Sequence, residues 1–371
     1  MTSPAPGVRA AAPAAKTDAP FVSVIVPVRN EANHVAHAIE RLFAQDYPLD
    51  RFEVIVADGR STDETRTIVT ALADRFPNLR LLDNPRQWSS AGRNVAAKAA
   101  RGEIVLLVDG HCEIDNVRYL ADLADAFERT GCDCVGRPQP LDVSGATPLQ
   151  RATAAARASR LGHHPASHIY SDREGFVPPQ SVAVAYRREV FERIGYFDES
   201  FDACEDVEFN HRVDRAGLRC FFTPRVAARY VPRASLRGLF RQMVRYGRGR
   251  ARLCRKHPET FSPRGFAPAA FVAGLLTGPL LALLSPWLGV LYAGTLGLYA
   301  AVVLAVSLLL ALRARQPALL PWLPLVFAAI HVGSGAGILL EWLTGRRLPA
   351  EERLPARVFR TEPEPAERRA A

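Results

Sequence analysis

A run without any charged residue extends from Phe266 to Leu312. A single helix over this run would measure roughly 70 Å at 1.5 Å per residue, about twice the thickness of a hydrocarbon core. The run therefore predicts membrane-spanning segments, because a core helix of a globular domain is much shorter. We expect three spans, near Phe266–Leu284, Trp287–Leu312 and Leu319–Leu340.

The chain divides into four parts by composition. The Ala/Pro-rich residues 1–20 and the charged, Pro-containing residues 346–371 read as disordered tails. Between them we expect an α/β domain over 21–257 and a membrane anchor over 258–345. Prolines interrupt the first tail, so it has no apolar segment of signal-peptide length, and we expect the α/β domain on the cytoplasmic side. The side on which the C-terminus lies stays open.

Positive charge is concentrated before the membrane anchor. The net charge is +9, and eleven Arg or Lys residues but no Asp or Glu lie between Arg225 and His257. Arginine recurs every fourth residue from 225 to 245, although Pro232 argues against one unbroken helix. We expect contact with anionic lipid headgroups or an ordinary solvated basic face. No nucleic-acid-binding module is recognisable, so we expect no nucleic-acid partner.

The α/β domain shows a regular alternation of strand and helix patterns. Apolar strands are predicted at 21–28, 52–57, 79–82 and 103–108, and helices at 33–44, 62–76, 90–100 and 116–130, with Thr62 as a helix cap. This rhythm predicts a mostly parallel sheet with helices on both faces. Residues 136–180 lose the pattern and are expected to form loops and short helices. A strand near 182–186 and a helix over 205–216 follow.

Polar segments follow three of the predicted strands directly. They are residues 27–31, 58–63 and 109–112, and the last two open with a carboxylate. Ligands of open α/β sheets bind beyond the carboxyl ends of the strands, so these segments predict the binding site.

Five sequence runs carry a resemblance to a known family. They are SVIVPVRNE (23–31), EVIVADGRSTDET (53–65), GRNVAAKAARGEIVLLVDGHC (92–112), CEDVEFNHRVDRAG (204–217) and RQMVRYGRGRAR (241–252). In order and spacing they resemble the GT-A glycosyltransferases of family 2, over residues 21–255. Within the family the chain resembles the bacterial exopolysaccharide type, and it is similar to the succinoglycan glucosyltransferase with a C-terminal membrane anchor. The resemblance implies a GT-A fold and a hexosyltransferase activity.

The resemblance assigns the nucleotide-sugar site to the first strand ends. Asp58 matches the aspartate that accepts hydrogen bonds from the uracil of UDP. Alternatively, Asp58 caps the turn that follows it. Pro27, Arg29 and Glu31 would frame the same pocket, and Arg93 would contact the nucleotide or sugar.

Asp109-Gly110-His111 stands at the position of the family's DxD metal motif. Asp109 matches the first carboxylate, whereas His111 replaces the second. The resemblance implies a divalent metal that neutralises the diphosphate, and an imidazole ligand favours Mn²⁺ over Mg²⁺. The alternative is that His111 is not a metal ligand.

Glu205-Asp206 matches the family's ED motif at the start of a helix. The resemblance implies that Asp206 is the general base for the acceptor hydroxyl and that Glu205 orients the acceptor or the structure. Two acids in a first helical turn are otherwise explained by the helix dipole.

Gln242, Arg245 and Tyr246 resemble the QxxRW motif of polymer-extending members, with Tyr in place of Trp. Their spacing puts them near one helix face. The resemblance implies contacts with the diphosphate or the acceptor sugar, and the Tyr leaves open whether additions are processive.

These features together predict an inverting, metal-dependent glycosyltransferase at the inner membrane, multi-pass and with a cytoplasmic catalytic domain. It would transfer a sugar from a UDP-sugar to a lipid-linked saccharide or growing polysaccharide. A polyprenyl-phosphate glycosyltransferase and a non-catalytic UDP-sugar-binding scaffold are the alternatives. The donated sugar, the linkage and the oligomeric state are not readable from the residues.

Overall fold

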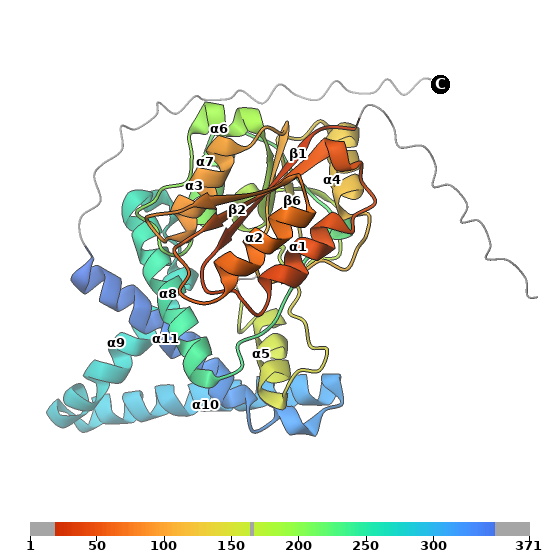
Figure 1. Ribbon diagram of the computed structural model, residues 1–371. Helices are drawn as coiled ribbons and strands as arrows, with labels where there is room; N and C mark the ends of the chain where they lie inside the picture. Colours follow the sequence, from red (N-terminus) through yellow and green to blue (C-terminus); the bar gives the residue numbers. More distant parts are fainter. Residues whose placement is uncertain (1–18, 164–166, 346–371) are drawn as a thin grey trace, which may run out of the picture.

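A computed structural model describes residues 19–163 and 167–345 of the chain. The tails expected at 1–20 and 346–371 lie outside the described residues, except for Ala19 and Pro20. The α/β domain sits above a group of long helices formed by the C-terminal part (Figure 1).

One eight-stranded sheet forms the centre of the domain, in the order β3-β2-β1-β4-β8-β6-β9-β7. The pairs among β3, β2, β1 and β4 are parallel, β6 is parallel to β9, and β8 and β7 run antiparallel to their neighbours. The predicted mostly parallel sheet is thus confirmed. The strands are β1 Val22–Val28, β2 Phe52–Asp58, β3 Leu79–Asp83, β4 Ile104–Leu107, β6 Cys134–Gly136, β7 Gly175–Val177, β8 Ala183–Arg187 and β9 Cys220–Phe222.

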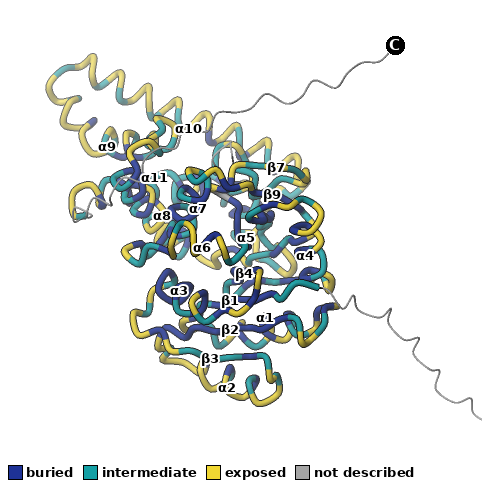
Figure 2. Tube along the Cα trace, turned by 90° about the horizontal axis from the view of Figure 1, so that it is seen from above, coloured by how far each residue is buried: buried dark blue, intermediate teal, exposed yellow. Residues whose placement is uncertain are grey.

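Helices cover both faces of the sheet because the central strands are apolar on both. Val24 and Val26 of β1 face the helices α1 (Val35–Phe43), α2 (Thr65–Arg75) and α4 (Tyr119–Thr130). Ile25 between them faces the opposite core, formed with α3 (Ser89–Ala99), α6 (Arg188–Ile194) and α7 (Glu205–Arg215). The alternation of side chains along one buried strand therefore builds two cores. Figure 2 shows these strands as the buried centre of the domain.

One local expectation needs correction. Thr62 does not cap α2, because its amide and hydroxyl groups bind Asn30 Oδ1 at 2.8 and 3.3 Å, and Glu64 takes the N-cap position. The irregular segment contains an eleven-residue helix, α5 (Pro148–Ala158), which opens with a capping box between Thr147 and Gln150. This helix lies within residues 136–180, where loops and short helices are expected.

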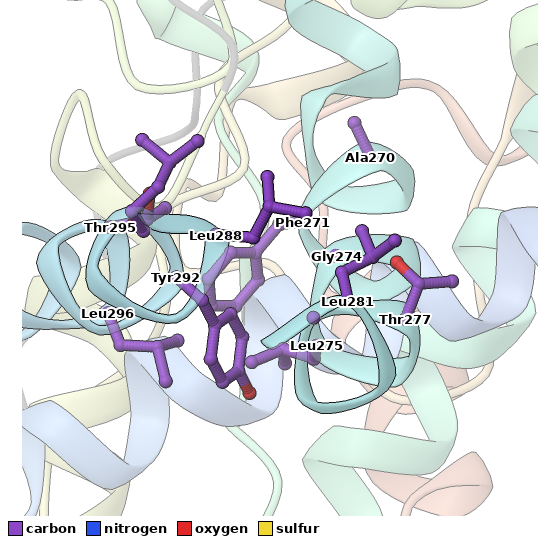
Figure 3. Close-up of a pocket in the computed structure, with 12 residues that line it drawn as sticks. Ala270, Phe271, Gly274, Leu275, Thr277, Leu281, Leu288, Tyr292, Thr295 and Leu296 are labelled. Carbon is purple, nitrogen blue, oxygen red and sulfur yellow. Dashed lines mark hydrogen bonds between the residues drawn. The ribbon is translucent and has the colours of Figure 1, made fainter. Parts of the chain in front are cut away.

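Three C-terminal helices are long and apolar enough to cross a membrane: α9 (Pro263–Leu284), α10 (Pro286–Ala314) and α11 (Leu323–Thr344). They coincide with the three predicted spans to within a few residues. The hairpin of α9 and α10 is largely exposed in Figure 2. An apolar crevice between these helices, in which Tyr292 packs over Gly278, is lined only by residues of α9 and α10 (Figure 3).

The helix α8 (Leu236–Lys256) runs beside α11 at the junction of the two parts (Figure 1). Glycines allow the backbones to touch. A Cβ on Gly247 would meet the carbonyl oxygen of Ser334, and a Cβ on Gly337 would meet that of Val244. Small residues at such positions are the usual device for close helix packing in membranes.

The α/β domain and the C-terminal apolar helices share a core. Ala152 and Ala156 of α5 and Leu239 and Met243 of α8 are buried together with a set of α11 residues, namely Leu323, Val326, Phe327 and Ile330. The domain boundary expected at residue 257 thus separates α8 from α11 in the sequence, although these two helices pack against each other.

The glycine contact between α8 and α11 generates a prediction. Gly247→Ala inserts a methyl group between two backbones, and such overpacking costs about 1–3 kcal/mol. We expect a clear fall in the melting temperature of the full chain in detergent, followed by tryptophan fluorescence. Gly294→Ala in α10 is the matched control, since its Cβ would meet nothing within 4 Å. Equal melting temperatures for the two variants would contradict the close packing.

Candidate active site

The loops after β1 and β2 interlock at the carboxyl edge of the sheet. The Asn30 amide donates to Ser61 Oγ at 2.9 Å, and the Glu31 amide donates to Thr65 Oγ1 at 2.8 Å. Asn30 has a φ of +56°, which an asparagine tolerates better than most residues. The two predicted polar segments are therefore one structural unit, and Pro27 and Arg29 lie at its base, beside Gly92 and Gly59 respectively.

Asp58, at the end of β2, is held by the protein itself. Its Oδ1 accepts the hydroxyl of Ser61 at 2.6 Å, and its Oδ2 accepts Arg66 at 3.2 Å. The side chain is only 1% exposed. These contacts agree with the turn-capping alternative for Asp58.

Asp109 follows β4 and receives two contacts from distant segments. Tyr230 donates its hydroxyl to Oδ2 at 3.0 Å, and Arg93 lies 3.3 Å from Oδ1. Burial would raise the pKa of Asp109, but the charges of Arg93 and His111 and the Tyr230 hydrogen bond outweigh it and lower the pKa. The carboxylate is therefore ionised, as a metal ligand must be.

His111 is oriented by Glu31 across the loop from β1. Its Nδ1 lies 3.0 Å from Glu31 Oε1, and this contact raises the pKa of His111 against the opposing effect of burial. Gly110 brings the motif against β1, because a Cβ there would meet Val28 Cγ1 at 2.8 Å. A carboxylate that holds one imidazole nitrogen leaves the other for a metal, which is a common arrangement around metal-bound histidine.

Arg93 joins the two predicted carboxylate motifs. This residue of α3 is 8% exposed and contacts Asp109 at 3.3 Å and Glu205 Oε1 at 3.2 Å. Burial raises the pKa of Glu205, although the charge of Arg93 opposes this. Asp206 is the next residue and is half-buried at the start of α7. The structure thus brings Asp109, His111, Glu31, Arg93 and the Glu205-Asp206 pair together.

The residues Gln242, Arg245 and Tyr246 lie on α8, on the other side of the loop that leads into Glu205. Gln242 Nε2 donates to the hydroxyl of Tyr246 at 3.2 Å, so these two residues share a helix face. Arg245 donates to the carbonyl of Asp202 at 2.9 Å. In the described ranges, no ion pair joins Arg245 to Asp109. Of the arginines before α8, Arg225 and Arg229 pair with Asp125 and Asp115, respectively.

Tyr230 is a site residue that sequence reasoning missed. It belongs to the two-residue strand β10 (Arg229–Tyr230), which pairs with β5 (Cys112–Glu113) directly after the metal motif. Its hydroxyl is also 3.5 Å from the buried Arg137. A two-residue strand leaves no periodic signal in the sequence. The position of Tyr230 beside Asp109 therefore becomes visible only through its contacts in the structure.

A second group with metal-ligand chemistry lies at the far end of α7. His211, His257 and Glu259 present ligand atoms within 4.8 Å of one another. Each already has protein partners: His211 and Arg215 contact Glu259 at 3.1 and 2.7 Å, and His257 contacts Glu208 at 3.1 Å. Cations therefore already balance these carboxylates, and we assign this group a structural role.

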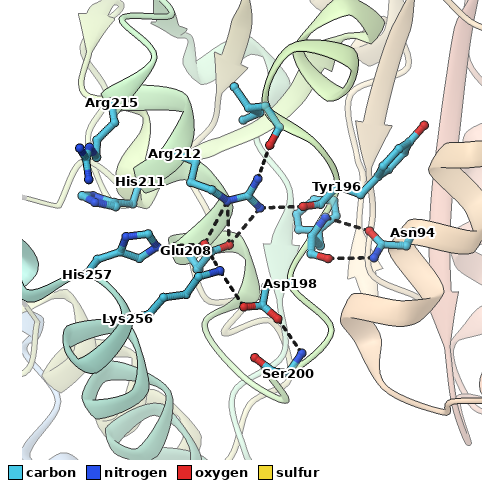
Figure 4. A network of polar contacts seen from close by, with 12 residues as sticks. Asn94, Tyr196, Asp198, Ser200, Glu208, His211, Arg212, Arg215, Lys256 and His257 are labelled. Atoms are coloured by element: carbon cyan, nitrogen blue, oxygen red, sulfur yellow. Dashed lines mark hydrogen bonds and ion pairs between the residues drawn. The ribbon is translucent and has the colours of Figure 1, made fainter. Parts of the chain in front are cut away.

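The buried Glu208 organises this group of ion pairs (Figure 4). Arg212 Nε and Lys256 Nζ both lie 3.0 Å from Oε1, and Lys256 also contacts Asp198 at 2.7 Å. Arg212 in addition donates to the carbonyls of Ile194 and Tyr196. The network ties α7, the end of α8 and the turn after α6 together behind the site.

Family models and known sequences that are similar to this chain describe glycosyltransferases and saccharide biosynthesis. The model described as Glycosyl transferase family 2 matches residues 23–195, and Glycosyl transferase family group 2 matches residues 117–329. Succinoglycan biosynthesis protein ExoA of Rhizobium meliloti is 34% identical over 87% of this chain and 96% of its own length. A dolichyl N-acetyl-α-D-glucosaminyl phosphate 3-β-D-2,3-diacetamido-2,3-dideoxy-β-D-glucuronosyltransferase of Methanococcus voltae is 24% identical over 64% of this chain and 74% of its own.

One solved structure of similar fold is a mannosyltransferase, PcManGT from Pyrobaculum calidifontis, in complex with GDP-Man and Mn²⁺. It is 24% identical and superposes with a TM-score of 0.55 over 86% of this chain and 88% of its own. The likeness confirms the predicted GT-A fold.

The network around Glu208 generates a prediction about stability and pH. Burial alone would raise the pKa of Glu208, but His257, Arg212 and Lys256 lower it to about 2. The ionised form is therefore worth roughly 3 kcal/mol at neutral pH, and this contribution is lost as the pH falls from about 4.5 towards 2.

We expect Glu208→Gln to lower the melting temperature strongly at pH 7 and progressively less below pH 4.5. Melting curves of both proteins across that range measure the difference. Glu192→Gln, on the exposed side of α6, is the control and should change little at any pH. A constant difference between Glu208→Gln and wild type down to pH 3 would contradict the assignment.

Proposed function

Because the chain belongs to glycosyltransferase family 2, we propose that it transfers a sugar from a UDP-sugar to a lipid-linked saccharide or growing polysaccharide, with inversion at the anomeric carbon. The relatives support the acceptor class, since one is named for succinoglycan biosynthesis and another for a dolichyl-linked saccharide substrate. The three apolar helices support a membrane enzyme. We place it in the inner membrane with the α/β domain on the cytoplasmic face as part of the proposal.

The observation that carries the proposal is the contact of one buried arginine with two motifs. Arg93 bridges Asp109, at the end of β4, and Glu205, at the start of α7. Donor and acceptor chemistry must meet within about 3–3.5 Å of the reacting atom. The bridge supports a site in which the diphosphate of a donor lies on the Asp109 side and the acceptor hydroxyl lies beside Asp206.

Asp206 is the general base in this proposal. Its carboxylate takes the proton from the acceptor hydroxyl while that oxygen bonds to the anomeric carbon. The bond between that carbon and the diphosphate oxygen breaks on the opposite face, so UDP leaves and the configuration inverts. Glu205 is engaged by Arg93 and therefore orients the helix start rather than taking the proton.

The residues around His111 fit a divalent metal. Asp109 offers an ionised carboxylate, and His111 offers the ring nitrogen that Glu31 does not hold. A mixed carboxylate and imidazole set suits Mn²⁺ better than Mg²⁺. Such an ion, when bound, would neutralise charge on the departing diphosphate. Glu31 sets the ring orientation, and Tyr230 and Arg93 hold Asp109 in place.

The acceptor side is formed by α8 and the loop before Glu205. Tyr246 is 40% exposed, and the guanidinium carbon of Arg157 in α5 lies 5.9 Å from its ring. An exposed aromatic ring suits stacking on a sugar, and Gln242 and Arg245 supply donors beside it. Because α5 and α8 pack against α11, a lipid-linked acceptor would meet these residues at the membrane surface.

The experiment that tests the proposal is UDP release by the full chain in detergent. UDP-glucose, UDP-galactose and UDP-N-acetylglucosamine are screened with membrane lipid extract, each with Mn²⁺, Mg²⁺ or EDTA. Release that depends on one donor, on lipid acceptor and on metal supports the proposal. UDP binding without release from any donor supports the scaffold alternative, and transfer to polyprenyl phosphate alone supports the carrier-lipid alternative.

A first prediction concerns the base. Asp206→Asn keeps the shape of the side chain but cannot accept the proton, so we expect turnover to fall by at least about 10²-fold while UDP affinity stays within about twofold. Asp214→Asn, at the other end of α7, is the matched control and should keep turnover. Loss of UDP binding in Asp206→Asn would remove the role assigned to Asp206.

A second prediction concerns the metal. We expect His111→Ala to raise the Mn²⁺ concentration for half-maximal turnover by about 10–100-fold, because a ligand is lost. His34→Ala is the control, since His34 is exposed and its side chain makes no capping hydrogen bond to α1. An unchanged Mn²⁺ dependence of His111→Ala would assign His111 a role other than ligation.

A further inference from the structure

We propose that Glu341 of α11 is a positioning residue for the transfer reaction, acting through Arg252 of α8 on the loop 198–204 that leads into Glu205-Asp206. The inference rests on the proposed function and extends it: the membrane part of the chain holds the catalytic loop in place as well as anchoring the enzyme.

Glu341 is an unusual residue in its surroundings. It is the only acidic residue between Glu259 and Glu351, and it is 2% exposed. Three arginines on one face of α8 converge on it: Arg248 Nε at 3.0 Å, Arg252 Nε at 3.2 Å, and Arg255. The three arginines direct four nitrogen donors at the carboxylate, which offers about four acceptor positions, so its hydrogen-bonding capacity is filled.

Arg252 is the only one of the three with described contacts beyond α11. Its Nη1 donates to Asp202 Oδ1 at 2.9 Å and to the Ser200 carbonyl at 2.8 Å, while Nε and Nη2 bind Glu341. The side chain is 12% exposed. Because the guanidinium group is planar and rigid, these contacts fix the distance between the end of α11 and the loop.

The loop has little freedom to absorb a shift of α8. A Cβ on Gly249 would meet the carbonyl of Ala203 at 2.6 Å and Cys204 Sγ at 2.8 Å, so the helix backbone touches the loop. On the opposite side Ser90 of α3 donates to the carbonyl of Phe201 at 2.9 Å. Cys204 then takes a left-handed φ of +63° as the N-cap of α7. A displacement of α8 is therefore passed directly to Glu205 and Asp206.

The three arginines provide a matched set for the test. Arg248 and Arg252 both bind Glu341, but only Arg252 also binds the loop in the described structure. Arg248→Met therefore removes a comparable ion pair from α11 without touching the loop. Arg252 also donates to Glu341 through two nitrogens where Arg248 uses one, so the effect of Arg252→Met on the loop itself, rather than on α11, is the informative difference.

The first measurement is steady-state transfer by the full chain, with separate kcat and KM for the donor. A misplacement of about 1 Å at a catalytic group can cost about 10²-fold in rate. We expect Arg252→Met and Glu341→Gln to lower kcat by about 10–100-fold, with donor KM and UDP affinity within about twofold. Arg248→Met should keep kcat within about threefold. Equal kcat losses in Arg248→Met and Arg252→Met, or an unchanged kcat in Arg252→Met, would overturn the proposal.

The second measurement does not depend on activity. Amide hydrogen exchange over residues 198–207 should become faster in Arg252→Met and Glu341→Gln but not in Arg248→Met. Unchanged exchange there, with faster exchange in α8 and α11 alone, would reduce Glu341 to a stabiliser of the helix pair. If wild type transfers no sugar, the proposed function fails and the catalytic part of this inference fails with it. The exchange data then still decide whether α11 controls the loop.

Discussion

The site depends on one buried cation. Arg93 contacts a carboxylate at the end of the parallel half of the sheet and another at the start of α7, and it is 8% exposed. Two carboxylates brought this close without a cation would repel each other, and burial would favour their neutral forms. With Arg93 between them, Asp109 stays ionised and α7 is fixed relative to β4. The two motifs can therefore serve one reaction.

A second constraint comes from α8, whose two sides contact different parts of the molecule. Gly247 faces α11 and Gly249 faces the loop before Glu205, and neither position has room for a side chain. The helix is thus held between α11 and the loop before Glu205, while the network around Glu208 secures its C-terminal end against α7. Backbone contact on both sides makes α8 a rigid connection, because there is no side-chain layer to adjust.

Much of the fold was predictable because its signal is local. Apolar runs that end in Asp58 and Asp109 mark strand ends, and parallel strands bring their ends to one edge, so the predicted loops meet as expected. The run without charged residues is also a local signal, and it predicts the three long apolar helices. The contact of Arg93 with the nucleotide or sugar stays a prediction, and its contacts with the two motif carboxylates join segments that are far apart in sequence. Tyr230 left no local signal, since it acts through a contact with a distant segment. Glu341 stands out as a lone acid in an apolar stretch, but its partners on α8 are distant in sequence and could not be read from it.

In the basic segment between Arg225 and His257, charge alone does not say which groups the arginines contact. A run of arginines without acids suggests a surface for lipid headgroups, and Arg237 and Arg241 remain exposed on α8. Yet Arg248, Arg252 and Arg255 turn inward to a single carboxylate that lies about ninety residues away in sequence, within an otherwise apolar stretch. Leaving such a carboxylate unpaired at the end of a membrane helix would be costly, and so would clustering three cations without it. The glutamate and the three arginines therefore each need the other as a partner. These ion pairs between α11 and α8 join the anchor to the α/β domain, in addition to the apolar core that the two parts share.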